Sequence, residues 1–489
     1  MKKKASPASS TPPSSGKDSP ARVSHTPVSP ARKAAYQVLL AVERGHSHSD
    51  DLLRSKAVDA LSAPDRHLAT ALVLGVLRWQ IQLDHATRAL LARPNAKLDA
   101  EIRVALRMGA FQILHMDRIP ARAAIDESVG LAKEAGHRFA SGMVNAVLRK
   151  LAPAPAAQPI DESDAGLALQ FAHPAWMVER WANFYGAEAA RAICAHGQRQ
   201  PATTIRLVDP GAEDELLRAG IELAPGSLLT AARTVLHGDI TATRAFIEGR
   251  IRMQDEGSQL VAELAAVGPN ENILDTCAAP GGKTLILAER NPQAHIVACE
   301  QSEPRLDALR QRLAAYSERI ECRLADASAL TDESVFDLAL ADVPCSGTGT
   351  LGRNPEIRHR LRPEDLPRQA ERQRAILSAA LRAVHPGGSV VYSTCSLEPE
   401  ENEQVIAAMV KGPTGPQQLD GEPEELDVKV LPAGELLAQL AARGVLTSEG
   451  LDRLRDAVTA EGALRLLPGR FACDGFFVCA LERTAVTKI

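Results

Sequence analysis

Several features that define large protein classes are missing from this chain of 489 residues. Only eight cysteines are present and none lies in a Cys-x-x-Cys pair, which excludes a disulfide scaffold and argues against a zinc ribbon. No apolar run approaches the roughly 18 residues of a membrane span. Aromatic residues make up 3% of the chain, so the cores must be aliphatic. We therefore expect a cytoplasmic protein with reduced cysteines that uses no membrane and no metal.

Charge is unevenly distributed along the chain, whose net charge is -5. The first 150 residues carry 23 Lys and Arg against 13 Asp and Glu, a balance of +10, and the remaining residues carry -15. A basic N-terminal third joined to an acidic body fits an anionic partner held at one end. Charge alone fits an unevenly solvated surface equally well.

Composition and periodicity divide the chain into four parts. Residues 1–30 are rich in Ser, Pro and Lys and predict a disordered tail. Residues 31–151 show helical periodicity without a strand pattern, which predicts an all-α domain. After a Pro/Ala linker, residues 160–250 mix helical and strand-like patterns, as in a small α+β domain. Residues 251–489 form the fourth part.

In this last part, short apolar runs alternate with Gly-rich turns and helical stretches. The runs are Asn272–Thr276, His295–Glu300, Ile320–Asp326, Phe336–Asp342 and Ser389–Thr394. This alternation predicts an α/β fold with a doubly wound parallel sheet and ligands at the carboxyl ends of its strands. We expect Leu464–Leu467 and Gly475–Leu481 to pair as an antiparallel edge. An acidic insertion over about residues 412–458 receives no structural assignment.

The segment Asp275-Thr-Cys-Ala-Ala-Pro-Gly-Gly-Lys-Thr284 lies between the first predicted strand and its helix. Gly281 and Gly282 would let the backbone approach a ligand, and the helix N-terminus offers free N–H groups. A phosphate-binding loop needs glycine where Cys277 stands, and the fingerprint Gly-x-Gly-x-x-Gly is also absent. The loop therefore indicates a different nucleotide-like ligand.

Acidic residues stand at the ends of the next two predicted strands. Glu300 closes the second strand, where a carboxylate can accept hydrogen bonds from ribose hydroxyls. Asp326 follows the third strand and is placed to reach an adenine amine. Each signal is weak by itself and gains weight from the glycine loop.

Two cysteines lie in polar turns after the fourth and fifth strands. The turns are Asp342-Val-Pro-Cys-Ser-Gly-Thr-Gly349 and Ser393-Thr-Cys-Ser396. Neighbouring parallel strands would bring Cys345 and Cys395 to one edge of the sheet. A single cysteine is more often a small buried residue, but this pair favours a nucleophilic role.

These three segments, in this order, resemble the Fmu/Sun/NOL family of S-adenosylmethionine-dependent RNA cytosine-5 methyltransferases. Ile251-Arg-Met-Gln-Asp-Glu-Gly-Ser-Gln and Asp474-Gly-Phe-Phe are similar to further family segments. The N-terminal third resembles a NusB-like RNA-binding module through Asp65-Arg-His, Gly75-Val-Leu-Arg-Trp79 and Val144-Asn-Ala-Val-Leu-Arg149. The resemblance implies a Rossmann-like methyltransferase, expected as a monomer, that acts on carbon 5 of a cytosine in 16S ribosomal RNA of the small subunit. Alternatives are the same reaction on tRNA, or a non-catalytic RNA-binding assembly factor.

The resemblance also implies a role for each motif residue. The methionine part of the cofactor would be held by Cys277, Ala278, Ala279, Pro280, Gly281, Gly282 and Lys283. Glu300, where the family more often has Asp, would bind the ribose, Asp326 the adenine, and Asp342 would line the site near cofactor and target base. Cys395 would be the nucleophile and Cys345 would assist product release. The residues alone leave the choice of nucleophile open, because DNA cytosine-5 methyltransferases use the Pro-Cys thiol.

Two further clusters have competing interpretations. His46-Ser-His48-Ser-Asp50 has metal-binding residue types, but its position favours a helix-capping turn with Ser47 or Ser49 as the cap. Arg353-Asn-Pro-Glu356, followed by Arg358, Arg360 and Arg362, fits a loop that grips an RNA backbone or a solvated helix entry equally well.

Overall fold

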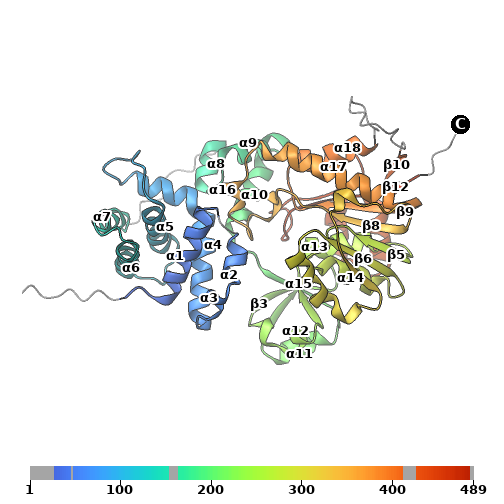
Figure 1. Cartoon of the computed structure of the whole chain (residues 1–489), viewed down its shortest axis with the longest axis horizontal. Coiled ribbons are helices and arrows are strands. Elements are labelled where there is room, and N and C mark those ends of the chain that lie inside the picture. The colour runs from blue at the N-terminus through green and yellow to red at the C-terminus, as the bar shows by residue number, and fades with distance from the viewer. Residues whose placement is uncertain (1–26, 46–47, 153–162, 411–425, 485–489) are drawn as a thin grey trace, which may run out of the picture.

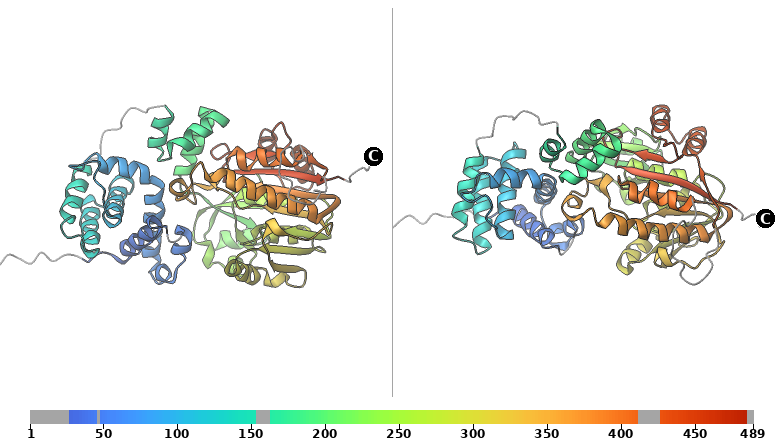
Figure 2. Two further views of the ribbon diagram at one scale, coloured as in Figure 1. Left: turned by 45° about the horizontal axis from the view of Figure 1, so that its top comes forward. Right: turned by 90° about the horizontal axis from the view of Figure 1, so that it is seen from above.

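The computed structural model describes residues 27–45, 48–152, 163–410 and 426–484 (Figure 1). An all-helical N-terminal domain lies at one end and a large sheet flanked by helices at the other, with a short helical segment and a small sheet between them (Figures 1 and 2). Within these ranges no helix is long and apolar enough to cross a membrane.

The N-terminal domain is built from helices whose apolar faces share one aliphatic core. They are α1 Pro30–Glu43, α2 Ser49–Leu53, α3 Lys56–Asp59, α4 Ala63–Arg88, α5 Ala100–His115, α6 Ala121–Glu134 and α7 Ser141–Leu151. The sequence suggests separate helices over 64–79 and 83–91, but α4 runs through both. Residues 80–82 are good helix formers and Leu83 is fully buried, so the helix continues without a break.

The segment after this domain contains two structural units. The helices α8 Asp164–Gln170, α9 Ala175–Tyr185 and α10 Ala187–Gln198 share a small core with Leu351 and Leu397 of the C-terminal part. A four-stranded antiparallel sheet follows in the order β2-β3-β1-β4. Its elements are β1 Thr203–Leu207, α11 Ala212–Arg218, β2 Glu222–Pro225, β3 Ala232–His237, α12 Arg244–Ile247 and β4 Ile251–Met253. The strand that begins at residue 251 therefore belongs to the small sheet.

The C-terminal part contains the predicted doubly wound sheet. Its parallel strands lie in the order β7-β6-β5-β8-β9. They are β5 Asn272–Asp275, β6 His295–Glu300, β7 Ile320–Leu324, β8 Phe336–Asp342 and β9 Val384–Thr394. The order of the strands reverses at β5, with β6 and β7 on one side of it and β8 and β9 on the other. The carboxyl ends of β5 and β8 therefore flank the crevice in which such folds bind ligands.

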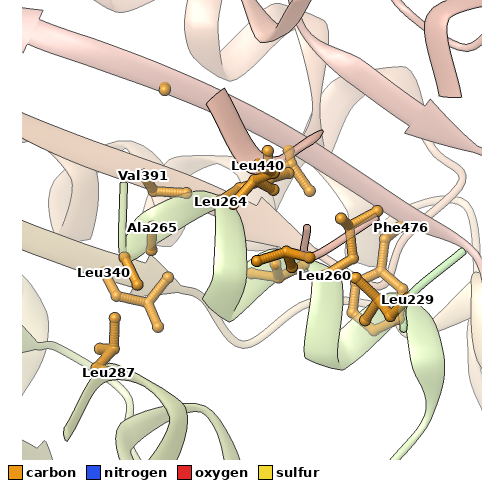
Figure 3. Packing of buried hydrophobic residues seen from close by; sticks show 14 of the residues in the cluster. Leu229, Leu260, Leu264, Ala265, Leu287, Leu340, Val391, Leu440 and Phe476 are labelled. Atoms are coloured by element: carbon orange, nitrogen blue, oxygen red, sulfur yellow. The ribbon is translucent and has the colours of Figure 1, made fainter. Parts of the chain in front are cut away.

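Alternation along the strands produces two buried faces. Ile273 points into the core formed with α13 Glu256–Ala265, α14 Gly282–Arg290 and α15 Glu303–Leu313, whereas Leu274 points to the opposite face. That opposite face is covered by α17 Asp365–Ala383 and α18 Glu403–Val410. Figure 3 shows Leu264 and Ala265 of α13 packed beside Leu340 and Val391 of the sheet. Both faces are covered, as a parallel sheet requires.

The last hundred residues show one expected pairing in an unexpected position and a folded segment that received no assignment. The strands β11 Leu464–Leu466 and β12 Phe476–Arg483 do pair, but β12 is an inner strand that lies between β9 and β10 Val428–Leu431. Within the supposed irregular insertion, residues 426–458 form β10, α19 Ala433–Ala442 and α20 Ser448–Arg455, and residues 412–425 lie outside the described ranges. Leu437 and Leu440 of α19 and Leu454 of α20 are buried in the main core, which holds both helices against the sheet.

Candidate active site

The two cysteines of the polar turns meet at the carboxyl edge of the sheet. The strands β8 and β9 are parallel neighbours in which Asp342 is aligned with Ser393. Each strand continues into a turn, and these turns place the Sγ atoms of Cys345 and Cys395 3.4 Å apart. Both thiols are free and half-buried. The expected juxtaposition of the two cysteines is thus present.

Backbone contacts lock the cysteine turns to each other and to the closing strand. The N–H of Gly349 donates to the carbonyl oxygen of Cys395 at 2.9 Å, and the N–H of Gly475 donates to the carbonyl oxygen of Gly349 at 2.9 Å. A Cβ at Gly349 would lie 2.6 Å from the Gly475 oxygen and 2.8 Å from the Cys395 oxygen. Glycine at 349 therefore permits three separate sequence segments to touch.

A lysine and an aspartate form an ion pair next to the cysteines. Lys283 Nζ lies 2.7 Å from Asp342 Oδ2, and the Ser393 hydroxyl donates to Asp342 Oδ1 at 2.7 Å. The Lys283 ammonium also lies 5.6 Å from the centre of the Phe476 ring. Both carboxylate oxygens of Asp342 thus have a partner, one from Lys283 of the glycine-loop helix and one from Ser393 of β9, and these contacts fix its orientation.

A cavity opens along the carboxyl ends of β5, β6, β7 and β8. Its lining residues are Thr276, Cys277, Ala279, Glu300, Gln301, Arg305, Ala325, Ala327, Asp342, Val343, Pro344, Cys345, Arg372, Ile376 and Cys395. Glu300 is buried, and its carboxylate accepts from the Ser302 N–H at 2.9 Å and lies 3.3 Å from Arg305 Nη2. This cavity brings two groups expected to contact a nucleoside, Glu300 and the turn after β7, to the cysteine pair.

Asp326 has a local structural role in this turn. Its carboxylate accepts from the Ser328 N–H at 3.0 Å and from the Ser328 hydroxyl at 2.7 Å, and these bonds lower the pKa of Asp326. The neighbours Ala325 and Ala327 line the cavity, whereas Asp326 is not among the lining residues.

A second pocket lies on the other side of Asp342 and Cys395. Its lining residues include Thr203, Thr204, Met253, Lys283, Arg353, Asp474 and Phe476, so the small sheet forms one wall. Asp342, Val343 and Cys395 line both hollows, whereas Cys345 lines the first but not the second. Cys395 is thus the cysteine that faces both spaces.

The residues of the glycine loop are divided between these spaces. Cys277 and Ala279 line the first cavity. A small hollow beside it is lined by Ala278, Pro280, Gly282 and Lys283, among others. Gly281 has a φ of +95°, and a Cβ there would lie 2.8 Å from the Leu309 side chain of α15. Glycine at 281 is therefore required by the turn and by helix packing.

The surroundings of Cys345 and Lys283 shift the pKa values of both groups. The hydrogen bond with Cys395, together with burial, raises the pKa of the Cys345 thiol well above its usual value. Burial alone would lower the pKa of the Lys283 ammonium, but Asp342 and Cys395 more than offset this effect and raise it. Cys345 therefore retains its proton at neutral pH and lies in hydrogen-bond contact with the Cys395 sulfur, beside a cationic lysine.

The arginine-rich segment after the first cysteine turn joins domains. Arg353 forms ion pairs with Asp474 at 2.7 Å and Asp255 at 3.0 Å. Arg358 is buried and donates to the backbone oxygens of Arg78 at 2.9 Å and Gly197 at 2.7 Å. Arg353 and Arg358 therefore neither grip an RNA backbone nor form a solvated helix entry, because their guanidinium groups bind partners inside the protein.

Contacts next to this segment show how the residues of the histidine cluster are used. The Ser49 N–H and hydroxyl donate to the buried Glu356 carboxylate, so Ser49 does not cap a helix. His48 precedes α2 and receives a hydrogen bond from Arg360, while His46 and Ser47 lie outside the described residues. No three His, Cys, Asp or Glu side chains in the described ranges are arranged to hold a metal ion.

Sequence reasoning missed a set of residues that complete the site. Arg305 and Arg372 line the first cavity from α15 and α17. Glu401, five residues after Ser396 of the second cysteine turn, is fully buried against both turns. The segment Glu398-Pro-Glu-Glu401 carries three acids, of which Glu398 and Glu401 are fully buried, but nothing in its order shows that Glu401 is the one that contacts both cysteine turns.

Comparisons with known proteins agree with this geometry. Residues 262–482 match the family model described as 16S rRNA methyltransferase RsmB/F. Residues 29–153 match the NusB family, and residues 173–209 match an RsmF/B-like ferredoxin-like domain.

Relatives match over most of their length. The probable ribosomal RNA small subunit methyltransferase B of Bacillus subtilis is 32% identical over 92% of this chain and 98% of its own. The ribosomal RNA small subunit methyltransferase B of Pseudomonas putida is 33% identical over 80% of this chain and 91% of its own. The crystal structure of PH0851 has the same fold, with a TM-score of 0.73 and 24% identity over 94% of this chain and 100% of that chain.

Proposed function

Because this chain belongs to the RsmB/F family of S-adenosylmethionine-dependent rRNA methyltransferases, we propose that it methylates carbon 5 of a cytosine in 16S ribosomal RNA through a covalent cysteine adduct. The observation that carries this proposal is the pair of thiols 3.4 Å apart between two hollows. Carbon 5 of cytosine is too weak a nucleophile to attack a methylsulfonium, and a thiolate added at carbon 6 supplies the missing electron density.

The first cavity suits S-adenosylmethionine by the chemistry of its lining. Glu300 offers a buried carboxylate at the end of β6, where ribose hydroxyls are bound in related folds. Ala325 and Ala327 leave space for a flat ring at the turn after β7. Thr276, Cys277 and Ala279 form the wall that extends toward the cysteines. When bound, the cofactor supplies an electrophilic methyl group.

The second pocket suits the target base. Cys395 and Asp342 line it together, so a base placed there would meet the thiolate and a hydrogen-bond acceptor for its amino edge. Phe476 supplies an apolar ring surface, and Lys283 supplies a cation beside it. A base inside an RNA helix must leave its stack to reach such a pocket.

The residues then divide the chemistry between them. Cys395 adds to carbon 6 as the thiolate, Asp342 accepts a hydrogen bond from the amino group and holds the base, and the Lys283 ammonium beside it favours uptake of negative charge in the ring. After carbon 5 is methylated, its proton passes to water, the electrons of that C–H bond re-form the double bond between carbons 5 and 6, and the bond between carbon 6 and sulfur breaks with its electron pair returning to Cys395. Cys345 retains a proton and lies against Cys395, which places it to assist release of the sulfur.

Variants of the two cysteines test this assignment. Cys395→Ala should abolish methylation, whereas Cys345→Ala should accumulate a covalent adduct with RNA that survives denaturing electrophoresis. Adduct accumulation by Cys395→Ala instead would reverse the roles, and adducts with neither variant would refute covalent catalysis.

The substrate is tested separately by bisulfite sequencing of total RNA from cells with and without the gene. Loss of methylation at one 16S cytosine supports the proposal. Loss at a tRNA cytosine would identify the alternative substrate. Calorimetric titration with S-adenosylmethionine addresses the non-catalytic alternative, because an assembly factor without enzymatic activity need not bind it.

A further inference from the structure

The two cysteine turns share a feature that the proposed mechanism does not use. Each cysteine is followed by a serine, in Cys345-Ser346 and Cys395-Ser396. The Oγ atoms of these serines lie 3.0 Å apart, beside the cysteine Sγ atoms at 3.4 Å. Both serines are buried, with 8% and 1% of their surface exposed.

One carboxylate holds both serines. Ser346 and Ser396 each donate a short hydrogen bond from the hydroxyl to Glu401 Oε2. Glu401 Oε1 accepts from the Ser346 N–H at 2.8 Å and from Gln373 Nε2 at 2.9 Å. Gln373 also donates to the Pro344 oxygen at 3.0 Å. Four donors thus occupy the acceptor sites of a carboxylate that has no exposed surface.

We propose that Glu401 is a positioning residue that sets the distance between the Cys345 and Cys395 sulfur atoms through Ser346 and Ser396. Glu401 lines neither hollow, so it acts through the serines and does not touch substrate or cofactor. The two turns follow different strands, and this side chain bridges them at the residues directly after the cysteines. The role of Glu401 in spacing the sulfur atoms is independent of the proposed function, and only the expected loss of methylation rests on that function.

Substitution should therefore separate the turns. In Glu401→Gln only one oxygen remains, so either the pair of serine hydroxyls or the pair of amide donors loses its acceptor. A second variant, Ser346→Ala/Ser396→Ala, keeps the carboxylate and removes the two hydroxyls through which it acts. Because the three residues form one network, adding Glu401→Gln to the double variant should have little further effect.

Phenylarsine oxide reports the sulfur geometry without any catalysis. It reacts with two neighbouring thiols, forming two As–S bonds and releasing water, and the full-length protein with bound reagent is counted by mass spectrometry. The wild type should take up one equivalent that survives a monothiol wash, and Cys345→Ala or Cys395→Ala should not. Glu401→Gln and the serine double variant should lose about tenfold or more of this affinity, because the second thiol is no longer poised to close the ring.

Glu256→Gln is the matched control. Glu256 is also a buried carboxylate that accepts from a serine hydroxyl and from backbone N–H groups, here Ser227, Leu228 and Leu229, and it lines neither hollow. It should keep wild-type capture of phenylarsine oxide even when its melting temperature falls as far as that of Glu401→Gln. Equal capture by Glu401→Gln and the wild type would overturn the proposal.

Methylation kinetics complete the test. Glu401→Gln should lower kcat by about 100-fold with little change in KM for either substrate, as expected for a misplacement of reacting groups by about 1 Å. A KM effect without a kcat effect would contradict positioning. If the wild type methylates no RNA, the proposed function fails, while capture of phenylarsine oxide still decides the role of Glu401.

Discussion

The buried guanidinium of Arg358 donates to the backbone oxygen of Arg78 at 2.9 Å, and Arg78 donates in return to the backbone oxygen of Gly352 at 2.8 Å. These contacts join helix α4 of the NusB-like domain to the segment that follows the first cysteine turn. Burial, reinforced by Arg78, lowers the pKa of Arg358 to about 9. The helical domain is therefore bound to the catalytic part through two arginines that use carbonyl oxygens as partners.

We expect Arg358→Lys to destabilise the protein more than Arg358→Met. Lysine keeps a buried positive charge but cannot reach the carbonyl oxygens that the guanidinium bridges, whereas methionine removes the charge at similar volume. The lysine variant should lose about 3 kcal/mol of unfolding free energy, as for a buried charge left without partners. Urea denaturation of both variants measures this difference. A methionine variant as unstable as the lysine variant would show that the hydrogen bonds matter more than the charge.

Gly349→Ala should destabilise the protein and abolish methylation. Its Cβ would meet backbone oxygens of Gly475 and Cys395 at 2.6 and 2.8 Å, so the cysteine turn has to shift. Overpacking of this kind costs about 1–3 kcal/mol. The control is Gly434→Ala in α19, where nothing lies within 4 Å of a Cβ and no loss is expected. Thermal melts and methylation assays on both variants test the contrast.

Lys283→Met should lower methylation without weakening cofactor binding. The family resemblance assigns Lys283 to the methionine part of the cofactor, but its side chain lines the second pocket and pairs with Asp342 at 2.7 Å. Loss of such a preorganised charge costs about 10²–10³ in kcat. Lys283→Arg, which retains the charge, should recover part of the rate. Weaker binding of S-adenosylmethionine by Lys283→Met in calorimetry would restore the assignment based on resemblance.

The stability of the protein should respond to pH through Asp275. Burial raises the pKa of this carboxyl to about 6, against the opposing hydrogen bond from Thr284. Below this pKa the folded protein holds a proton that the unfolded chain has already released, so stability falls as pH rises toward 6. The difference in unfolding free energy between Asp275→Asn and the wild type should therefore grow in favour of the variant by about 2 kcal/mol from about pH 4.5 to about pH 7. Urea denaturation across this range measures the gain, and parallel curves for the two proteins would contradict it.

Local signals in the sequence were sufficient to predict the parallel strands and the turns that carry the site residues. Apolar runs separated by Gly-rich turns predicted β5 through β9, and their carboxyl ends brought Cys345 and Cys395 together as expected. These features could be predicted because strand alternation and turn residues act over a few positions. The predicted antiparallel pairing of β11 with β12 is present, but β12 is not at the edge of the sheet, because β10 from an acidic stretch without a clear pattern also pairs with it.

Contacts between distant segments were decided only by the tertiary structure. Arg353 and Arg358 are charged residues in a loop-like segment, and a sequence cannot show that their partners are Asp474 and the backbone of α4. Glu401 is one of three acids in four residues, and only the approach of both cysteine turns makes it the acceptor for Ser346 and Ser396. The fold class, the family and the meeting of Cys345 with Cys395 could be predicted from the sequence, because they depend on local patterns and motif order. The tertiary structure decided which charged groups are buried, because burial depends on neighbours that are hundreds of residues away.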